Sequence, residues 1–421
     1  MVFNLTIYEQ ALKGIITKEM NHVSKIEKVS QKEILKGISK GRVVIMRRQG
    51  FNPIGIGYPL RTKINVNLGT SSSKINIDEE FEKVKIAQKH GADTISDLSM
   101  GGDIDSIRRS ILKLTTLPLT TVPIYQSVVE AESVSNVSEE IIFRVLEKQL
   151  KDGISSIVIH AGFTLEDLNS MKGKRIMKMV SKGGTLTASI MNSNKRENPF
   201  QANFMQILDL IKEYDVVLSL GNAMRSGCIH DKIDEFQISE IKTNKKLAKL
   251  ANKYGVQVIL ESLGGHINAK DIIKWVKRHK KITNNRPLFV SGPLPVDIGT
   301  GHDHISAAVG GAFASGFGAD YICAITPAEH LSLPSLEDIK KGLIACKIAA
   351  HVGDSMKYGL NHLFNDDLNL AKNRFLKNWK KQFEYIIDPE EAIKRHNLNG
   401  DNDICSMCGN HCALSLSKKI L

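Results

Sequence analysis

Three cysteines lie close together near the end of the chain, in the segment DICSMCGNHCALS (403–415). Cys405, Cys408 and Cys412 follow the pattern C-x2-C-x3-C, which lets one short loop wrap three thiols around a common centre. A structural zinc site needs four ligands, and this chain has no second C-x2-C pair. His411 is a candidate fourth ligand, but its neighbour Cys412 makes that geometry awkward.

A site with three thiolates suits a [4Fe–4S] cluster better than it suits a zinc ion. Such a cluster normally has four thiolate ligands, so three of them leave one iron open to an external ligand. Radical S-adenosylmethionine (SAM) chemistry needs that open iron, because the amine and carboxylate of the methionine part chelate it before an electron cleaves the sulfonium to a carbon radical. A structural zinc knob or a disordered reactive tail stays open as the alternative.

The secondary-structure elements that must position such a centre alternate regularly along the chain. From about Asp93, short β-branched runs alternate with amphipathic helical stretches, a pattern typical of a parallel sheet. The predicted strands are DTISDL, TTVPIY, SSIVIH, LTASIM, VVLSL, VQVILES, LFVSG and DYICAIT. Eight strand-helix units predict an α/β fold with a closed (β/α)8 barrel of the TIM type. A doubly wound open sheet is the alternative.

Polar and reactive residues follow these strands, where a barrel of this type carries its active site. They include Tyr125, His160, Asn222, Arg225, Glu261, His266, Glu329 and His330. Before the barrel, GRVVIMRR and KINVNLGTSSS are predicted as strands of a smaller region, and two long helices precede the cysteines. We therefore expect an α+β domain over residues 1–75, the barrel over 76–345, and C-terminal helices with a cluster-binding tail over 346–421.

The composition limits the class of partner. The net charge of +12 comes from lysines spread along helical stretches, not from one basic block, so we expect a small anionic substrate and no nucleic acid. No run approaches the roughly 20 apolar residues of a membrane span, and the first residues lack the order of a signal peptide. We expect a cytoplasmic protein with no membrane partner.

The motifs together resemble one family. They are NVNLGTS, DTISDLSMGGD, TVPIYQ, VIHAG, SKGGT, NPF, RSGCIHD, GPLPVDIGTGHDHI, TPAEHLSLP, KIAAH and CSMCG, in this order over nearly the whole chain. In this respect the sequence is similar to the phosphomethylpyrimidine synthase family, the non-standard radical SAM family of thiamine biosynthesis.

The resemblance implies a barrel that holds 5-aminoimidazole ribotide, a C-terminal segment that carries the [4Fe–4S] cluster, and S-adenosyl-L-methionine. Because that segment reaches the neighbouring subunit in this family, it also implies a homodimer. By motif position, His266 and His330 correspond to two histidines that bind zinc or iron(II). The matching substrate contacts are Asn67, Tyr125, His160, Ser181, Gly183 and Arg225.

Other positions depart from the family pattern. The methionine of its MDLS motif is Ser96, the arginine of SRGG is Lys182, the aspartate of GDGLRPG is Asn222, and the tyrosine before GPL is Phe289. Ser96 and Phe289 still count as predicted substrate contacts. Lys182, Asn222 and the retained acid Glu261 are the predicted groups for proton handling or charge stabilisation.

Asparagine in place of aspartate at position 222 removes a negative charge. Lysine in place of arginine at position 182 removes a group that can donate two parallel hydrogen bonds. Drift in a divergent lineage is one explanation of these departures. Altered chemistry is the other, and it favours a paralogue of the 5-hydroxybenzimidazole synthase type, which makes the cobalamin lower ligand and in some anaerobes acts with a second paralogue. We therefore predict this radical SAM lyase reaction first, as a homodimer or as a heterodimer with a paralogue. The alternatives are the phosphomethylpyrimidine synthase of thiamine biosynthesis and, second, a non-catalytic partner subunit.

Overall fold

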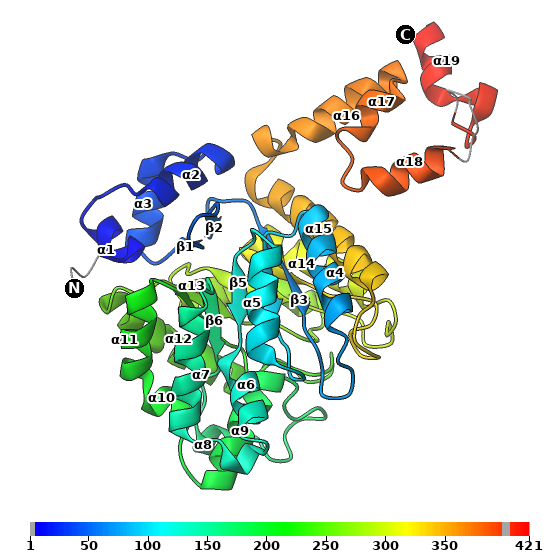
Figure 1. The fold of residues 1–421 in the computed structure, drawn as a ribbon. Helices are drawn as coiled ribbons and strands as arrows, with labels where there is room; N and C mark the ends of the chain where they lie inside the picture. Colours follow the sequence, from blue (N-terminus) through cyan, green and yellow to red (C-terminus); the bar gives the residue numbers. More distant parts are fainter. Residues whose placement is uncertain (1–4, 398–404, 421) are drawn as a thin grey trace. The chain divides into compact units, whose positions relative to one another are not determined.

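A computed structural model describes residues 5–397 and 405–420 of the chain. The chain forms two compact units, residues 1–357 and 358–421 (Figure 1). The first contains the barrel and an N-terminal region. The second contains the cysteine segment.

The first unit is built on a closed barrel of parallel strands, as the sequence predicts. In order around the barrel the strands are β3 (Lys63–Leu68), β4 (Thr94–Asp97), β5 (Leu119–Thr121), β6 (Ser156–Ile159), β7 (Val217–Leu220), β8 (Val258–Glu261), β9 (Leu288–Ser291) and β10 (Tyr321–Ala324). β10 pairs with β3 and closes the barrel, with Tyr321 opposite Lys63. The predicted α/β barrel is confirmed.

Two of the predicted strands were assigned wrongly. The run LTASIM (186–191) is helical and belongs to α9 (Lys182–Asn194). The missing strand is β3, which the sequence analysis placed in the N-terminal region. The barrel thus begins before residue 76, and the predicted boundary at 345/346 falls inside α15 (Leu336–Tyr358).

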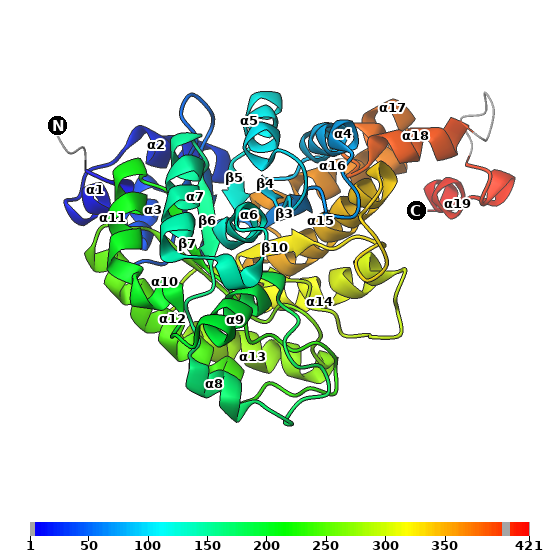
Figure 2. The same ribbon diagram turned by 60° about the horizontal axis from the view of Figure 1, so that its bottom comes forward.

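Helices surround the strands, as Figure 2 shows from another side. They are α4 (Ile77–Lys89), α5 (Ile104–Leu114), α6 (Pro123–Glu130), α7 (Glu139–Lys151), α8 (Leu165–Ser170), α9, α10 (Pro199–Ala202), α11 (Phe204–Tyr214), α12 (Glu235–Lys253), α13 (Ala269–Ile282), α14 (Asp303–Phe317) and α15. A short 3-10 turn, η1 (Val134–Asn136), precedes α7. The apolar faces of these helices and the strands share one large core.

The N-terminal region covers one end of the barrel (Figure 1). It contains α1 (Ile7–Leu12), α2 (Lys18–Glu27), α3 (Gln31–Ser39) and the antiparallel pair β1 (Val44–Met46) and β2 (Ile54–Ile56). Val44 and Met46 pack against Val217, Ile259 and Tyr321 in one apolar cluster. Because these barrel residues lie in the first half of their strands, the hairpin seals the amino-terminal end of the barrel.

The C-terminal unit is helical. It contains η2 (His362–Phe364), α16 (Asn365–Leu376), α17 (Trp379–Phe383), α18 (Pro389–Asn397), η3 (Gly409–His411) and α19 (Ala413–Ile420). Lys418 lies over the ring of Phe375 at 4.6 Å, and Lys377 is hydrogen-bonded to Ser415. These contacts hold α19 beside α16.

Candidate functional site

A cavity of about 820 Å³ opens at the carboxyl ends of the barrel strands. Five predicted site residues line it: Asn67, Lys182, Arg225, His266 and His330. They come from five different strand-helix connections or strand ends, so the closed barrel brings together residues that are far apart in sequence. This is the face at which barrels of this type carry their active sites.

The two predicted metal ligands face each other. His266 Nε2 lies 3.2 Å from His330 Nε2. His266 Nδ1 lies 2.7 Å from Asp297 Oδ1, and His330 Nδ1 lies 3.0 Å from Asp303 Oδ1. When Nδ1–H donates to a carboxylate, the proton stays on Nδ1 and the lone pair of Nε2 is free. This is the usual arrangement of a metal-binding histidine.

Two such lone pairs repel each other at this distance unless a proton or a cation lies between them. Zinc binds imidazole nitrogens at about 2.0–2.1 Å, so one ion can contact both Nε2 atoms. The donor set therefore fits a metal ion that is bound by these two histidines and has further positions open.

The start of α9 arranges a second group of predicted residues. Ser181 is the N-cap of this helix, and its Oγ accepts from the backbone N–H of Gly184 at 3.2 Å. The same Oγ lies 3.2 Å from His160 Nε2. A Cβ atom on Gly183 would lie 2.3 Å from His160 Cε1, so only glycine lets the imidazole approach the helix.

His160 is an uncharged, buried group. Burial, followed by the positive charge of Arg225, lowers the pKa of His160 to about 3. His160 Nδ1 is buried, and no hydrogen-bond partner for it occurs within the described chain. Arg225 Nε is buried without a partner in the same sense. Unpaired polar atoms of this kind are costly, so they indicate a place for a ligand.

Arg225 connects the predicted residues electrostatically. Its charge lowers the pKa of Tyr125, but burial has the larger effect and raises that pKa to about 12. Burial also raises the pKa of Glu261, against the pull of Arg225 and a hydrogen bond from Ser219 Oγ to Glu261 Oε1 at 2.8 Å. Lys182 Nζ lies 5.3 Å from the centre of the Tyr125 ring, and burial lowers the Lys182 pKa.

A polar hub inside the barrel holds Asn67 and Ser96. Asn65 Nδ2 donates to Asn67 Oδ1 at 2.8 Å. The hydroxyls of Ser96, Thr94 and Tyr321 donate to Asn65 Oδ1 at 3.0, 3.0 and 3.2 Å. Asn65 is completely buried, so it presents the amide of Asn67 to the cavity in one orientation and keeps Ser96 turned inward.

Eight of the thirteen predicted barrel residues are not among those that line the cavity: Ser96, Tyr125, His160, Ser181, Gly183, Asn222, Glu261 and Phe289. Two of them, Asn222 and Phe289, are directed elsewhere. Asn222 Nδ2 donates to Glu240 Oε2 at 2.7 Å, so its amide is engaged with α12. Phe289 stacks on Tyr321 with ring centres 4.1 Å apart and packs against the apolar cluster below the hairpin. Their positions support the barrel wall instead of the cavity surface.

The cysteine segment forms a compact turn in the C-terminal unit. Cys408 and Cys412 flank η3, and the thiols of all three cysteines are free. Cys412 precedes α19, and hydrogen bonds from the backbone and side chain of Ser415 lower its pKa. Since a thiolate is the form that binds iron, this donor set fits an iron–sulfur cluster.

The sequence analysis missed several residues of the site. Asp297 and Asp303 lie in the quoted motif GPLPVDIGTGHDHI, but nothing in a single sequence shows that they reach the two histidines. Glu329, which was named among the residues that follow the strands but given no role, also lines the cavity, and burial raises its pKa against the attraction of Arg225, His330 and Lys182. Asn65 could have been found from the alternating polar residues of KINVNL.

Comparison with known proteins identifies relatives over the full length. The model of the radical SAM ThiC family matches residues 6–419. Phosphomethylpyrimidine synthases of Thermoanaerobacter sp. (strain X514) and Caldanaerobacter subterraneus subsp. tengcongensis are 44% and 45% identical, each over 99% of this chain and 98% of the relative. The phosphomethylpyrimidine synthase of Pyrococcus furiosus is 42% identical over 99% of both chains.

These relatives correct the predicted partner. The sequence analysis inferred a paralogous partner from the substitutions at Lys182, Asn222 and Phe289. That prediction is wrong, because full-length relatives at this identity carry the name of the pyrimidine-forming enzyme.

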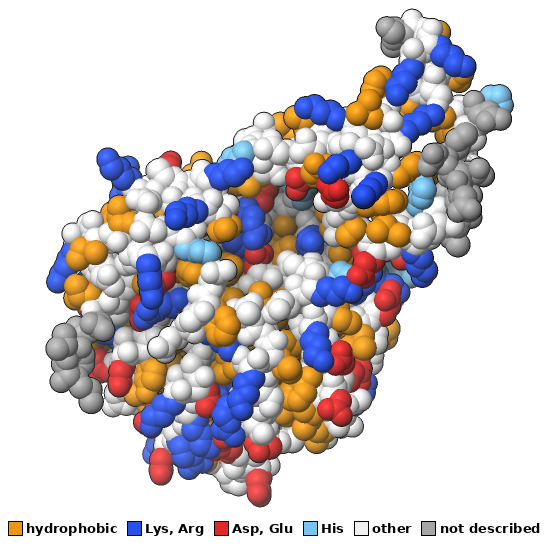
Figure 3. All heavy atoms as spheres, turned by 45° about the horizontal axis from the view of Figure 1, so that its top comes forward, with side chains coloured by type: hydrophobic (Ala, Val, Ile, Leu, Met, Phe, Trp, Pro, Cys, Tyr) orange, Lys and Arg blue, Asp and Glu red, His pale blue; other side chains and the backbone are white. Residues whose placement is uncertain are grey.

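Two observations concern the surface. No helix within residues 5–397 or 405–420 combines the length and apolarity needed to cross a bilayer. On the face shown in Figure 3, Lys and Arg side chains are interspersed with Asp and Glu.

Proposed function

This chain belongs to the radical SAM ThiC family of enzymes, and we propose that it is a phosphomethylpyrimidine synthase, which rearranges 5-aminoimidazole ribotide into hydroxymethylpyrimidine phosphate for thiamine biosynthesis. The relatives favour this activity, which the sequence analysis placed second, and give no support to the benzimidazole product. The observation that carries the proposal is the facing pair His266 and His330 on a cavity that also holds the unpaired Arg225 Nε.

The ribotide is an anion with an azole ring, and the start of α9 suits its phosphate. The first N–H groups of a helix and the positive end of its dipole attract phosphate, and Lys182 adds a charge there. Neutral His160 and Tyr125 offer hydrogen-bonding partners for the azole, and Asn67 offers an amide held by Asn65. Arg225 would complete the cradle with its free Nε.

We assign the [4Fe–4S] cluster to Cys405, Cys408 and Cys412, and zinc or iron(II) to His266 and His330. When bound, the cluster supplies the electron that cleaves S-adenosyl-L-methionine and so initiates hydrogen abstraction from the ribotide. Three thiolates must stay reduced for this purpose, which supports a cytoplasmic location.

Glu261 and Lys182 are our candidates for proton transfer during the rearrangement. Burial shifts the pKa of the Glu261 carboxyl upward and that of the Lys182 amine downward, so both move toward neutral pH, where a group can take up and release protons. Asn222, whose amide bonds Glu240, is assigned a positioning role for the loop after β7.

The test is a product analysis under anaerobic conditions. The protein is reconstituted with iron and sulfide, then given dithionite, S-adenosyl-L-methionine and aminoimidazole ribotide, and the products are identified by mass spectrometry. Hydroxymethylpyrimidine phosphate is expected. A benzimidazole product, or 5′-deoxyadenosine with neither product, would refute the proposal.

A further inference from the structure

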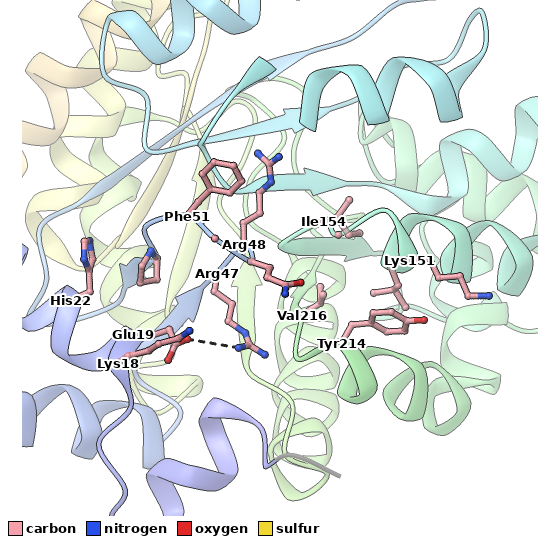
Figure 4. Close-up of a pocket in the computed structure, with 15 residues that line it drawn as sticks. Lys18, Glu19, His22, Arg47, Arg48, Phe51, Lys151, Ile154, Tyr214 and Val216 are labelled. Carbon is pink, nitrogen blue, oxygen red and sulfur yellow. Dashed lines mark ion pairs between the residues drawn. The ribbon is translucent and has the colours of Figure 1, made fainter. Parts of the chain in front are cut away.

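A second cavity, of about 730 Å³, lies at the opposite end of the barrel, beside the N-terminal region. Figure 4 shows Lys18, Glu19 and His22 on one side and Ile154, Tyr214 and Val216 on the other, with the segment 47–53 between them. Ile154 and Val216 come shortly before β6 and β7, so this is the amino-terminal face of the barrel. It shares no lining residue with the cavity at the strand carboxyl ends.

The lining carries a surplus of positive charge. Lys18, Arg47, Arg48 and Lys151 are basic, and Glu19 is the one acidic residue among those that line it. Two of these charges are compensated: Arg47 lies 3.1 Å from Asp215 and 3.7 Å from Glu19, and Lys151 lies 2.6 Å from Glu147. In the part of the chain that the structure describes, no ion pair joins Lys18 or Arg48 to a carboxylate.

Arg48 is held in place by backbone and not by an acid. Its two Nη atoms donate to the carbonyl oxygens of Leu112 and Thr115 at the end of α5. These carbonyls carry the partial negative charge of a helix C-terminus, which offsets only part of a full positive charge. Burial lowers the pKa of Arg48, as expected for a guanidinium that lacks a carboxylate partner.

An aromatic ring stands next to this charge. Phe51 lies with its ring centre 4.4 Å from Arg48 Cζ, yet 40% of its surface is exposed. Opposite it, Tyr214, Ile154 and Val216 contribute an apolar wall. A volume of this size suits a small metabolite, since ligand pockets commonly span about 300–1,000 Å³.

We propose that this cavity binds a phosphorylated heterocycle of the nucleoside monophosphate class. The phosphate would pair with Lys18 in the positive field that Arg48 adds, and the flat ring would lie against Phe51 and the apolar wall, as rings do on exposed aromatic side chains. The proposal is independent of the reaction at the other end of the barrel. It would make the N-terminal region a ligand-sensing part of the protein.

The probe is adenosine 5′-monophosphate, with its binding to the full chain measured by isothermal titration calorimetry. Adenosine and inorganic phosphate are titrated separately. Lys18→Glu reverses one charge of the cavity, whereas Lys25→Glu makes the same change on the same helix outside the lining. Phe51→Ala removes the exposed ring. Arg225→Ala reports binding in the other cavity, and melting temperatures confirm that each variant folds.

We expect adenosine 5′-monophosphate to bind more tightly than either fragment. Its Kd should rise about tenfold or more in Lys18→Glu, since one lost charged contact has that magnitude. It should also rise in Phe51→Ala and stay unchanged in Lys25→Glu and Arg225→Ala. Absence of binding to the wild type, equal effects of Lys18→Glu and Lys25→Glu, or loss only in Arg225→Ala would overturn the proposal. Equal affinity for phosphate alone would also overturn it, because the ring would then have no role.

Discussion

Asn222 Nδ2 donates to Glu240 Oε2 at 2.7 Å in the interior of the barrel wall. The same carboxyl group accepts from the backbone N–H of Ala223 at 2.6 Å and of Met224 at 3.1 Å. One buried side chain of α12 therefore fixes three consecutive residues of the loop that leads to Arg225. The loop conformation depends on this single acid.

Glu240 should make stability depend on pH. Burial raises its folded-state pKa from 4.5 to about 7. Between these values the folded protein holds a proton that the unfolded chain has lost, so the Glu240 contribution to the free energy of unfolding falls as pH rises from 4.5 to about 7. Glu240→Gln should show a shallower slope in this window in urea unfolding. The free energy of unfolding of this variant should also fall by about 1–3 kcal/mol, because an amide cannot accept every hydrogen bond that the carboxyl group accepts. Equal slopes for the variant and the wild type would contradict this assignment.

The histidine pair predicts the metal content. His330→Ala should abolish binding of zinc or iron(II) at this site, since one imidazole remains. Asp297→Asn should weaken metal affinity about 10- to 100-fold, because the carboxylate that orients His266 is lost. Competition with a chelator followed by elemental analysis measures both effects. Asp209→Asn, the same change at an exposed position of α11, is the control and should leave the affinity unchanged.

Substitution in the cysteine segment should cause a separate loss, that of the iron–sulfur cluster. Cys408→Ser should leave two thiolates and prevent assembly of the cluster, so after anaerobic reconstitution sulfide per chain should fall to background and iron to no more than the one ion of the histidine site. Cys228→Ser, outside the segment, should keep full iron and sulfide content. A Cys408→Ser protein that still holds four iron atoms per chain would mean that the ligands were assigned wrongly.

Gly183 predicts an effect on the substrate side. In Gly183→Ala the new methyl would lie 2.3 Å from His160 Cε1, so the imidazole must move away from Ser181. The affinity for aminoimidazole ribotide should fall while the melting temperature changes little, as equilibrium binding and calorimetry would show. Gly299→Ala meets its nearest atom only at 3.6 Å and should behave as the wild type.

Much of the fold could be predicted from the alternation of strands and helices. The error at 186–191 has a physical reason: Thr187 and Ile190 are strand-forming types, but Ser181 caps a helix that buries Thr187, Ile190 and Met191 on one face. β3 was placed outside the barrel because eight strand-like runs had already been counted from about Asp93 onward, one of them the helical run at 186–191. Nothing in the sequence shows where the polar residues Asn65 and Asn67 point. They face a polar interior.

The site was predictable only in part. The residues that follow strands could be named, because strand ends meet at one face of a barrel. Asp297, Asp303 and Glu240 could not, since their partners depend on how loops and helices pack in three dimensions. The resemblance of motifs gave the histidines, whereas the hydrogen bonds of their Nδ1 atoms to Asp297 and Asp303 came from the structure.

The pairing of β3 with β10 also determines when the barrel can close during synthesis of the chain. Residues 63–66 pair with residues 321–324, so the barrel cannot close until nearly four-fifths of the chain has left the ribosome. His330 follows β10 by six positions and meets His266 only after that closure. Such long-range pairing is slow to form. His266 and His330 therefore come together only after this long-range pairing has formed.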